Sequence, residues 1–245
     1  MQSIKRLTKL FVGATIAVCA LACSSGNPGP GSPSYKAGAL GNGGFTFRCD
    51  DSVACDRWSN SAQNFPTKVA AGSSFELNFF AKNENGTIEI KINEAPDHRG
   101  YHIEGVQSHV GKDANGKFAV TKPGIATFMA RDGKGWIVDY VTMQVFQPDG
   151  LVVYESSYKG STPPRVQSIN LTKSQRKSFR AVGEINKQPL AGAFTVDWSS
   201  ADPAIVDIET ISEGTATIIA KGPGTTKLIA EAAGTKEEIA VEVAQ

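Results

Sequence analysis

The chain has 245 residues, of which 40% are hydrophobic and 20% charged, so its composition is that of a globular protein rather than a disordered one. Its 25 Lys and Arg residues against 24 Asp and Glu give a formal net charge of +1, which argues against a nucleic-acid partner, since such a partner demands a concentrated basic excess. Glycine (25) and proline (12), with many Val, Ile and Thr, favour strands and tight turns over long helices.

The first residues have the pattern of a secretory leader. Lys5, Arg6 and Lys9 make a short basic start, and residues 10–22 follow without a charge. That apolar run is too short for a stable transmembrane helix, which takes roughly 20 apolar residues, and no later run approaches that length. A basic start, a short apolar stretch and small residues at its end predict a leader that is removed on export.

The end of the leader resembles the lipobox of bacterial lipoproteins. The usual pattern is Leu-(Ala/Ser)-(Gly/Ala)-Cys; Ala20-Leu21-Ala22-Cys23 shares with it the small residue at Ala22 and the cysteine, and departs from it at Ala20, where Leu is commonest. The resemblance implies cleavage after residues 1–22 and lipid attachment at the Cys23 thiol, with acylation of the new amino group. Ser24 is not Asp, which in enterobacteria-like sorting implies the outer membrane. The alternative is plain secretion with a chance cysteine at position 23.

Residues 23–44 read as a flexible tether, because Gly, Pro and Ser dominate them and offer little to bury. Beyond the leader and Cys23, two cysteines remain, Cys49 and Cys55. In an oxidising compartment an even pair at this spacing predicts a local disulfide. The alternative is a two-thiolate metal site, but no second Cys or His pair follows at zinc spacing.

Residues 45–158 predict a first antiparallel β-sandwich. Strand-like runs occupy 74–80, 87–92, 117–120, 125–130, 136–146 and 151–154, with glycine-containing turns between them. Residues 159–164, which include Pro163-Pro164, read as a linker to a second module at 165–245.

The second module has strand-like runs at 166–171, 177–182, 194–208, 214–230 and 238–243. Val196-Asp-Trp198-Ser-Ser-Ala-Asp202-Pro203, Ile205-Val-Asp-Ile208 and Ala220-Lys-Gly-Pro-Gly-Thr-Thr together resemble the bacterial immunoglobulin-like group 2 (Big2) family, although the common Gly-Xaa-Val step before Gly214 is missing. From the residues alone, Trp198 is the large aromatic side chain expected to fill the space between two sheets, and is therefore predicted to be structural core.

A weak internal repeat relates the two modules. Residues 118–130 and 218–230 both run from a strand through a Lys and a Pro-Gly turn into a second strand. We therefore expect an all-β chain, with two immunoglobulin-like antiparallel β-sandwich domains in tandem after the signal peptide and tether.

No residue pattern indicates catalysis, so we expect no enzyme and no cofactor. The three histidines fall in one stretch, and His98 and His102, with Asp97 or Glu104, are weak candidates for a metal site. The competing interpretation, a polar solvated loop, is favoured because Gly100 and Gly105 argue against the helix that would align the two histidines. No serine lies in a Gly-Xaa-Ser-Xaa-Gly elbow, and no phosphate-binding glycine loop occurs.

These features predict a non-enzymatic cell-envelope lipoprotein, held to a membrane by its lipid, whose modules act as spacer and as adhesion or protein-interaction surface. The alternative is a module that binds an extracellular glycan or small ligand through exposed aromatic rings. Tyr101 is the preferred candidate for such a ring, because it lies in a loop-like stretch. Trp136 and Tyr140 fall in a predicted strand and are expected to be core.

Overall fold

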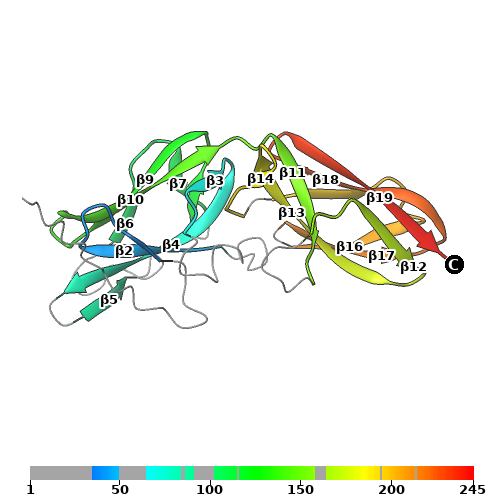
Figure 1. Ribbon diagram of the computed structural model, residues 1–245, viewed down its shortest axis with the longest axis horizontal. Helices are drawn as coiled ribbons and strands as arrows, with labels where there is room; N and C mark the ends of the chain where they lie inside the picture. The colour runs from blue at the N-terminus through cyan, green and yellow to red at the C-terminus, as the bar shows by residue number, and fades with distance from the viewer. Residues whose placement is uncertain are drawn as a thin grey trace, which may run out of the picture.

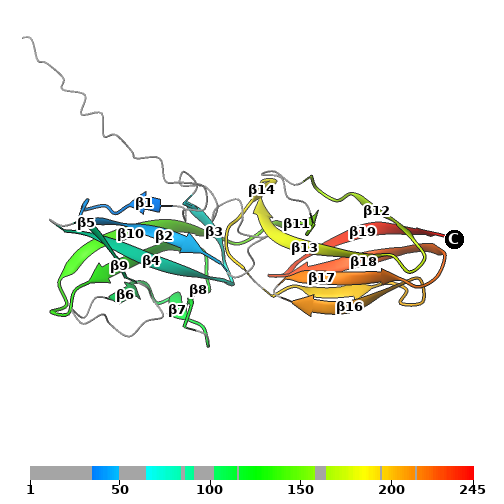
Figure 2. The ribbon, with the colours of Figure 1, turned by 90° about the horizontal axis from the view of Figure 1, so that it is seen from below.

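The computed structural model describes residues 35–49, 65–83, 86–90, 102–114, 116–157, 164–193, 195–212 and 214–245, and every regular element in these ranges is a β-strand. The strands form two sandwiches that lie end to end along the longest axis, with the C-terminus at the far end of the second (Figures 1 and 2). The prediction of an all-β chain with two immunoglobulin-like sandwiches is confirmed.

The first sandwich packs a sheet in the order β1-β2-β4-β8-β7, with β5 also paired to β4, against a sheet in the order β3-β10-β9-β6. Its strands are β1 (Tyr35–Ala37), β2 (Gly43–Arg48), β3 (Lys68–Ala70), β4 (Ser73–Asn83), β5 (Gly86–Ile90), β6 (His102–Gly105), β7 (Val110–Lys112), β8 (Phe118–Val120), β9 (Gly124–Arg131) and β10 (Ile137–Phe146). All pairs are antiparallel except β3 with β10, which is parallel.

The second sandwich packs β11-β13-β17-β16, with β14 also paired to β13, against β12-β19-β18-β15. Its strands are β11 (Gly150–Glu155), β12 (Ser168–Thr172), β13 (Arg176–Ile185), β14 (Gln188–Pro189), β15 (Asp197–Ser200), β16 (Val206–Ser212), β17 (Thr215–Ala220), β18 (Gly224–Ala232) and β19 (Thr235–Ala244). Again a single pair, β12 with β19, is parallel.

The two sandwiches share one topology. If β2 is matched with β11, every strand from β3 to β10 has a counterpart from β12 to β19 in the same position of the same sheet. The internal repeat seen in the sequence falls on the step from β8 to β9 and from β17 to β18, where the chain passes between sheets. Gly124 and Gly224 begin the second strand of each step with φ of 144° and 142°, a conformation that favours glycine.

Each sandwich has its own core of inward-facing side chains. The first core contains an aromatic cluster in which rings approach to centroid distances of 4.8 to 6.3 Å, formed by Phe45, Phe47, Phe65, Phe75, Phe79, Phe118 and Phe128. The second core contains Trp198, which is 6% exposed, among aliphatic side chains from both sheets. The indole Nε1 donates a hydrogen bond to the carbonyl of Gly214 at 3.2 Å, so this buried ring has its polar atom satisfied.

The strand pairing corrects the expected limits of the modules. Residues 151–154, expected at the end of the first sandwich, lie in β11, which pairs along its whole length with β13 of the second. In chain order, the predicted linker 159–164 therefore falls between β11 and β12, two strands of the second sandwich. The tether is also shorter than expected, because Tyr35–Ala37 forms β1 on the edge of β2. A two-residue periodicity shows that residues form a strand but not which strand they pair with.

The true connection between the sandwiches is residues 147–149, and a second segment joins them as well. Ala191 and Ala193, which follow β14, insert into the first sandwich: Ala70 N donates to Ala191 O at 2.9 Å, and Ser74 N donates to Ala193 O at 2.8 Å. Ala191 bridges to Val69 and Ala193 to Ser74, so this segment spans from one sheet of the first sandwich to the other. Ala191 is fully buried in the first core although it belongs to the second half of the chain.

Candidate interaction surface

The structure locates some of the residues expected to carry function. Cys23 and Cys55 lie outside the described residues. Cys49 follows β2 and is 8% exposed at the margin of the first core. Because Cys55 is not described, the pairing of the two cysteines stays a prediction. No helix long and apolar enough to cross a bilayer occurs among the described residues.

The candidate metal ligands are not brought together in the part of the chain that the structure describes. His102 lies exposed on β6, whereas His98 lies outside the described residues. Glu104, two residues further along β6, forms an ion pair with Arg131 of the neighbouring strand β9. Among the described residues no three His, Cys, Asp or Glu side chains are placed to hold a metal ion.

Trp136 is not a core residue, contrary to expectation. Strand β10 begins one residue later, at Ile137, and the Trp136 side chain is 73% exposed. Leu40 and Ile137 are also unusually exposed for their size, at 51% and 42%. We call these three residues the Trp136 end; the β9–β10 connection, which carries Trp136 and leads into Ile137, lies at the end of the molecule opposite the C-terminus (Figures 1 and 2).

The loop that carries Trp136 is held by its own polar groups. The Asp132 carboxylate accepts hydrogen bonds from the backbone N–H groups of Lys134 and Trp136, both at 2.9 Å. The guanidinium of Arg131 donates to the carbonyl of Gly135 at 2.7 Å while it also binds Glu104. The indole is therefore displayed on a braced turn, so that a binding partner need not pay to order it.

Leu40 is held at the same end by Asp139, a fully buried carboxylate. Its two oxygens accept hydrogen bonds from the backbone N–H groups of Leu40 (2.8 Å), Asn42 (2.9 Å) and Gly43 (3.0 Å), and Asp139 Oδ1 also accepts one from Tyr140 (2.8 Å). The β1–β2 hairpin is thereby fastened onto β10. In the sequence Asp139 merely interrupts a strand pattern, and the only signal of its role was a charged residue in an otherwise apolar alternation.

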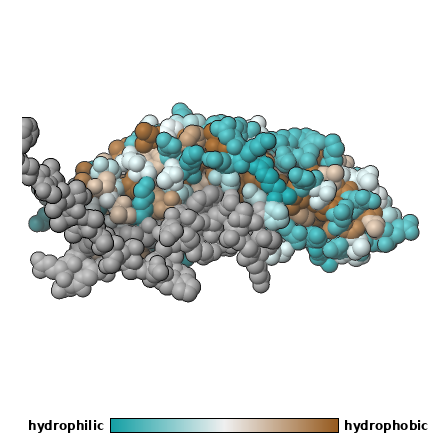
Figure 3. Space-filling model, viewed as in Figure 1, coloured by the Kyte–Doolittle hydropathy of each residue, from teal (hydrophilic) through white to brown (hydrophobic). Residues whose placement is uncertain are grey.

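The surface differs between the two sandwiches. In Figure 3 brown patches recur along the upper edge of the first sandwich, and on the second sandwich brown areas lie among predominantly teal ones. Ile137 and Ile125 supply exposed apolar area on β10 and β9, and no residue of β18 or β19 is a strongly exposed large apolar one. Among the described residues, most of the strongly exposed large apolar side chains lie in the first sandwich, and Ile211 on β16, at 51%, lies in the second.

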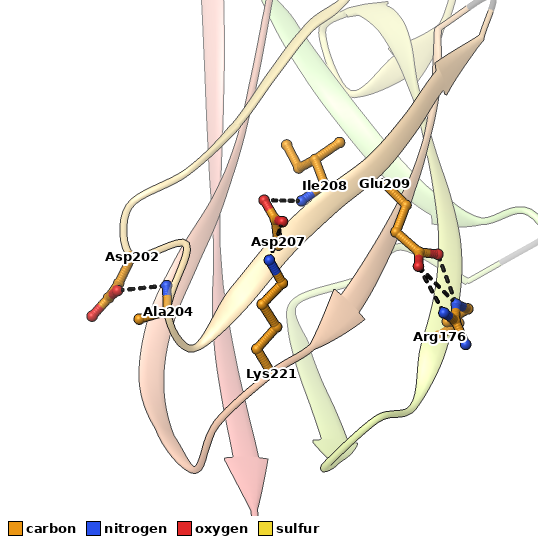
Figure 4. Close-up of polar contacts among 7 residues, drawn as sticks. All are labelled: Arg176, Asp202, Ala204, Asp207, Ile208, Glu209 and Lys221. Carbon is orange, nitrogen blue, oxygen red and sulfur yellow. Dashed lines mark hydrogen bonds and ion pairs between the residues drawn. The ribbon is translucent and has the colours of Figure 1, made fainter.

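The outer end of the second sandwich carries paired charges (Figure 4). Asp207 on β16 binds Lys221 beyond the end of β17, and Glu209 on β16 binds the Arg176 guanidinium on β13 through both carboxylate oxygens. The Lys221 ammonium, then the Ile208 backbone N–H, lower the pKa of Asp207, and Arg176 lowers the pKa of Glu209. Carboxyl groups with lowered pKa values stay ionised at neutral pH and cannot act as general acids there.

Asp202 has a purely conformational part in the same region (Figure 4). Its carboxylate accepts a hydrogen bond from the backbone N–H of Ala204 at 3.0 Å, which stabilises the turn at Pro203 before β16 begins. This turn, identified in the sequence by Asp202-Pro203, is therefore structural.

We expect the Glu238 carboxyl to titrate near pH 2. It lies on β19 between Lys227 at 2.8 Å and Lys236 at 2.9 Å, and these two ammonium groups lower its pKa to about 2. Because the folded pKa is below the unfolded value, the contribution to stability is present above about pH 4.5 and is lost as the pH falls towards 2. An NMR titration of the Glu238 carboxyl carbon measures this pKa, and Lys227→Met should raise its midpoint. An unchanged midpoint would contradict the ion pair between Lys227 and Glu238.

Comparison with known proteins gives a limited assignment. Residues 198–244, from β15 to β19, match the family model described as the pilus formation protein N terminal region. The matched residues make up less than half of the chain. No curated protein matches.

Several solved structures are similar to the chain at low identity. Domains 4 and 5 of the S-layer protein SbsC are 15% identical over 70% of this chain and 82% of that one, with a TM-score of 0.31. The chain spans only 25% and 23% of two longer SbsC structures. A 282-residue C-terminal fragment of intimin, solved with the intimin-binding domain of its receptor Tir, is 14% identical over 71% of this chain and 61% of that one, with a TM-score of 0.27. The Escherichia coli adhesin FdeC is 12% identical over 74% of this chain and 62% of that one, with a TM-score of 0.29.

Proposed function

We propose that this chain is a non-enzymatic lipoprotein of the cell envelope, anchored to the outer membrane through Cys23, in which two sandwiches form one stiff spacer. The spacer holds the second sandwich away from the membrane as a protein-interaction or adhesion surface. The observation that carries the proposal is the junction, where the second sandwich contributes Ala191 to the core of the first.

Two features of the junction favour a spacer over a hinged pair. The connection at 147–149 is short, and Asp149 is tied at both ends: its N–H donates to Glu184 O, and its carboxylate accepts from Asn186 N, each at 2.9 Å. On the other side, Ala70 and Ser74 hydrogen-bond to Ala191 and Ala193. Hinge motion would have to break the backbone bonds to Ala191 and Ala193, and the bond between the fully buried Ala70 and Ala191 is costly to leave unmade.

The anchor rests on the sequence. The basic start, the apolar run and the lipobox-like residues before Cys23 agree in position, and a short segment then leads to β1 of the first sandwich. Attachment on that side places the second sandwich farther from the membrane along the chain. Its paired charges suit a soluble, outward-facing module.

The alternative function, binding of an extracellular glycan or small ligand, is favoured by one observation, the exposed indole of Trp136. A sugar site also needs a cleft with a second ring. Tyr140 is only partly exposed, and Tyr101 lies outside the described residues. A pocket on the second sandwich is lined by Glu155, Ser156, Ser157, Arg176, Lys177 and Ser178, none of which has a ring. A glycan array with the wild type and Trp136→Ala tests this alternative.

The anchor is tested by the intact mass of the protein purified from its native membrane. We expect the mass of a chain that begins at Cys23 plus acyl groups, and a gain of two hydrogens on reduction if Cys49 and Cys55 are joined. Cys23→Ser is the matched control, which should abolish acylation and the added mass of the acyl groups. A wild-type mass without acyl groups would overturn the anchor.

A further inference from the structure

We propose that the Trp136 end docks on the lipid surface of the membrane that holds the anchor, so that the protein stands on the bilayer by its first sandwich. The inference rests on the proposed function in one respect: the lipid on Cys23 brings this end close to the membrane.

The chemistry of the Trp136 end suits the interfacial region of a bilayer. An indole has an apolar body and one polar N–H, and tryptophan is enriched where acyl chains meet headgroups. Leu40 and Ile137 add exposed aliphatic area, and Lys134, exposed in the same loop as Trp136, can pair with anionic headgroups. Asp132 is already engaged with backbone N–H groups of that loop, so its charge is partly compensated.

The backbone at this end is built to display these side chains. Asp132 holds the turn before Trp136, and Asp139 holds the hairpin that carries Leu40. The two loops belong to strands far apart in the sequence, yet Leu40 N lies 2.8 Å from the carboxylate of Asp139, two residues after Ile137. Preorganised apolar loops lose little conformational entropy on insertion.

The position of the anchor favours the same end. Residues 24–34 between Cys23 and β1 can span at most about 40 Å. Tyr35 pairs with Thr46, three residues along β2 from Gly43, which places the start of β1 only about 10 Å from the hairpin at the Trp136 end. The C-terminus lies at the opposite end of the molecule (Figures 1 and 2). Within that reach, the Trp136 end can meet the bilayer.

Docking would add a second contact to the acyl anchor and would orient the rod. Acyl chains hold the chain to the membrane but leave a flexibly tethered protein free to tilt. A contact through Leu40, Trp136 and Ile137 would fix the end opposite the second sandwich on the bilayer. The stiff junction would then direct the second sandwich away from it.

The first test measures whether Trp136 enters the bilayer in the mature acylated protein. The protein is reconstituted in vesicles of phosphatidylcholine and phosphatidylglycerol, roughly 3:1, with or without brominated acyl chains. We expect brominated lipid to quench the tryptophan fluorescence of a Trp58→Phe protein, and the further change Trp136→Phe to remove about half or more of that quenching, because of the two indoles that the structure describes Trp136 is exposed and Trp198 is buried. Equal quenching in the two proteins would overturn the proposal.

The second test separates docking from the anchor. The mature Cys23→Ser chain, which has no thiol to acylate, is sedimented with the same vesicles. We expect the triple variant Leu40→Ser, Trp136→Ser and Ile137→Ser to lower its partition coefficient about tenfold. Ile125→Ser is the matched control, since Ile125 is 59% exposed but pairs with Gln144 at the other end of β9, and it should leave binding unchanged.

Each outcome has a distinct meaning. Patch-dependent binding of the Cys23→Ser chain supports docking even if the native protein proves to carry no acyl group. An acylated native protein whose Trp136 stays accessible to acrylamide on vesicles keeps the anchor and overturns docking. Protection of Trp136 by a protein or a glycan but not by lipid also overturns it and identifies the class of partner instead.

Discussion

Replacing Asp139 with alanine is expected to lower the free energy of unfolding of the first sandwich by about 3 kcal/mol or more. The Asp139 side chain is fully buried and accepts hydrogen bonds from four backbone N–H groups, those of Leu40, Asn42, Gly43 and Tyr140. Alanine would leave these donors without an acceptor, and each buried unsatisfied group costs about 1 to 3 kcal/mol unless water reaches it. Urea unfolding followed by circular dichroism measures the loss.

Two variants show whether the loss comes from this network. Asp139→Asn keeps one acceptor oxygen but turns an NH₂ group towards the remaining N–H donors, so we expect an intermediate loss. Asp132→Ala is the matched control, because Asp132 also accepts two backbone N–H groups but in an exposed loop, where water can replace it at a cost of about 1 kcal/mol or less. If Asp139→Ala were no more destabilising than Asp132→Ala, the buried carboxylate would not be what fastens the hairpin.

Local patterns in the sequence predict the strands well because a strand facing a core must alternate. Residues 74–80 and 125–130 both lie within observed strands, β4 and β9, and the Pro-Gly repeat marks the crossing between sheets in both halves. Trp198 in a β-rich run was expected to be buried, and a ring of that size has few places in a sandwich except between the sheets.

Long-range pairing could not be predicted in the same way. Residues 151–154 would have the same apolar pattern in either sandwich. Their pairing with β13 depends on the backbone register between distant strands, which local sequence does not indicate. The position of Ala191 could not be predicted either, because a small residue after a short hairpin does not indicate that it lies in the core of the other sandwich. The module boundary was therefore misplaced.

The exposed and buried exceptions were also missed, for a related reason. Trp136 is a large apolar residue and Asp139 a charged one, so residue type alone assigns the first to the core and the second to the surface. The structure reverses both, because the turn held by Asp132 ends just before β10 begins and the β1–β2 hairpin covers Asp139. Residues that break the local rule are the ones that build the Trp136 end, as is common at functional sites.

Gly192→Ala is expected to destabilise the junction by about 3 kcal/mol. Gly192 has φ of +102°, and a Cβ there would lie 2.1 Å from Ser73 Oγ and 2.6 Å from Ser73 Cβ. The Ser73 hydroxyl cannot swing away freely, since Ser73 is 1% exposed and its Oγ donates to Ala70 O at 2.6 Å. The added methyl must therefore push the Ala191–Ala193 segment out of the first sandwich.

Gly234→Ala provides the matched control for backbone strain. Gly234 also has positive φ, at +78°, but a Cβ there would meet nothing within 4 Å, so we expect a loss of only about 1 kcal/mol. Ser73→Gly removes both close atoms and should restore part of the stability of Gly192→Ala, with a coupling energy of about 1 kcal/mol or more. Urea unfolding gives the free energies of unfolding of Gly192→Ala, Gly234→Ala, Ser73→Gly and the double variant that combines Ser73→Gly with Gly192→Ala.

The same variants decide whether the junction makes the rod stiff. Small-angle X-ray scattering should show the extended end-to-end form in the wild type and in Gly234→Ala. In Gly192→Ala the loss of the hydrogen bonds from Ala70 and Ser74 leaves residues 147–149 as the main link, so the scattering should require a broader set of orientations. Unchanged scattering, together with a loss no greater than that of Gly234→Ala, would mean that the inserted segment is a passive contact. The direction of the second sandwich would then have to be set by the 147–149 connection and its ties to Glu184 and Asn186.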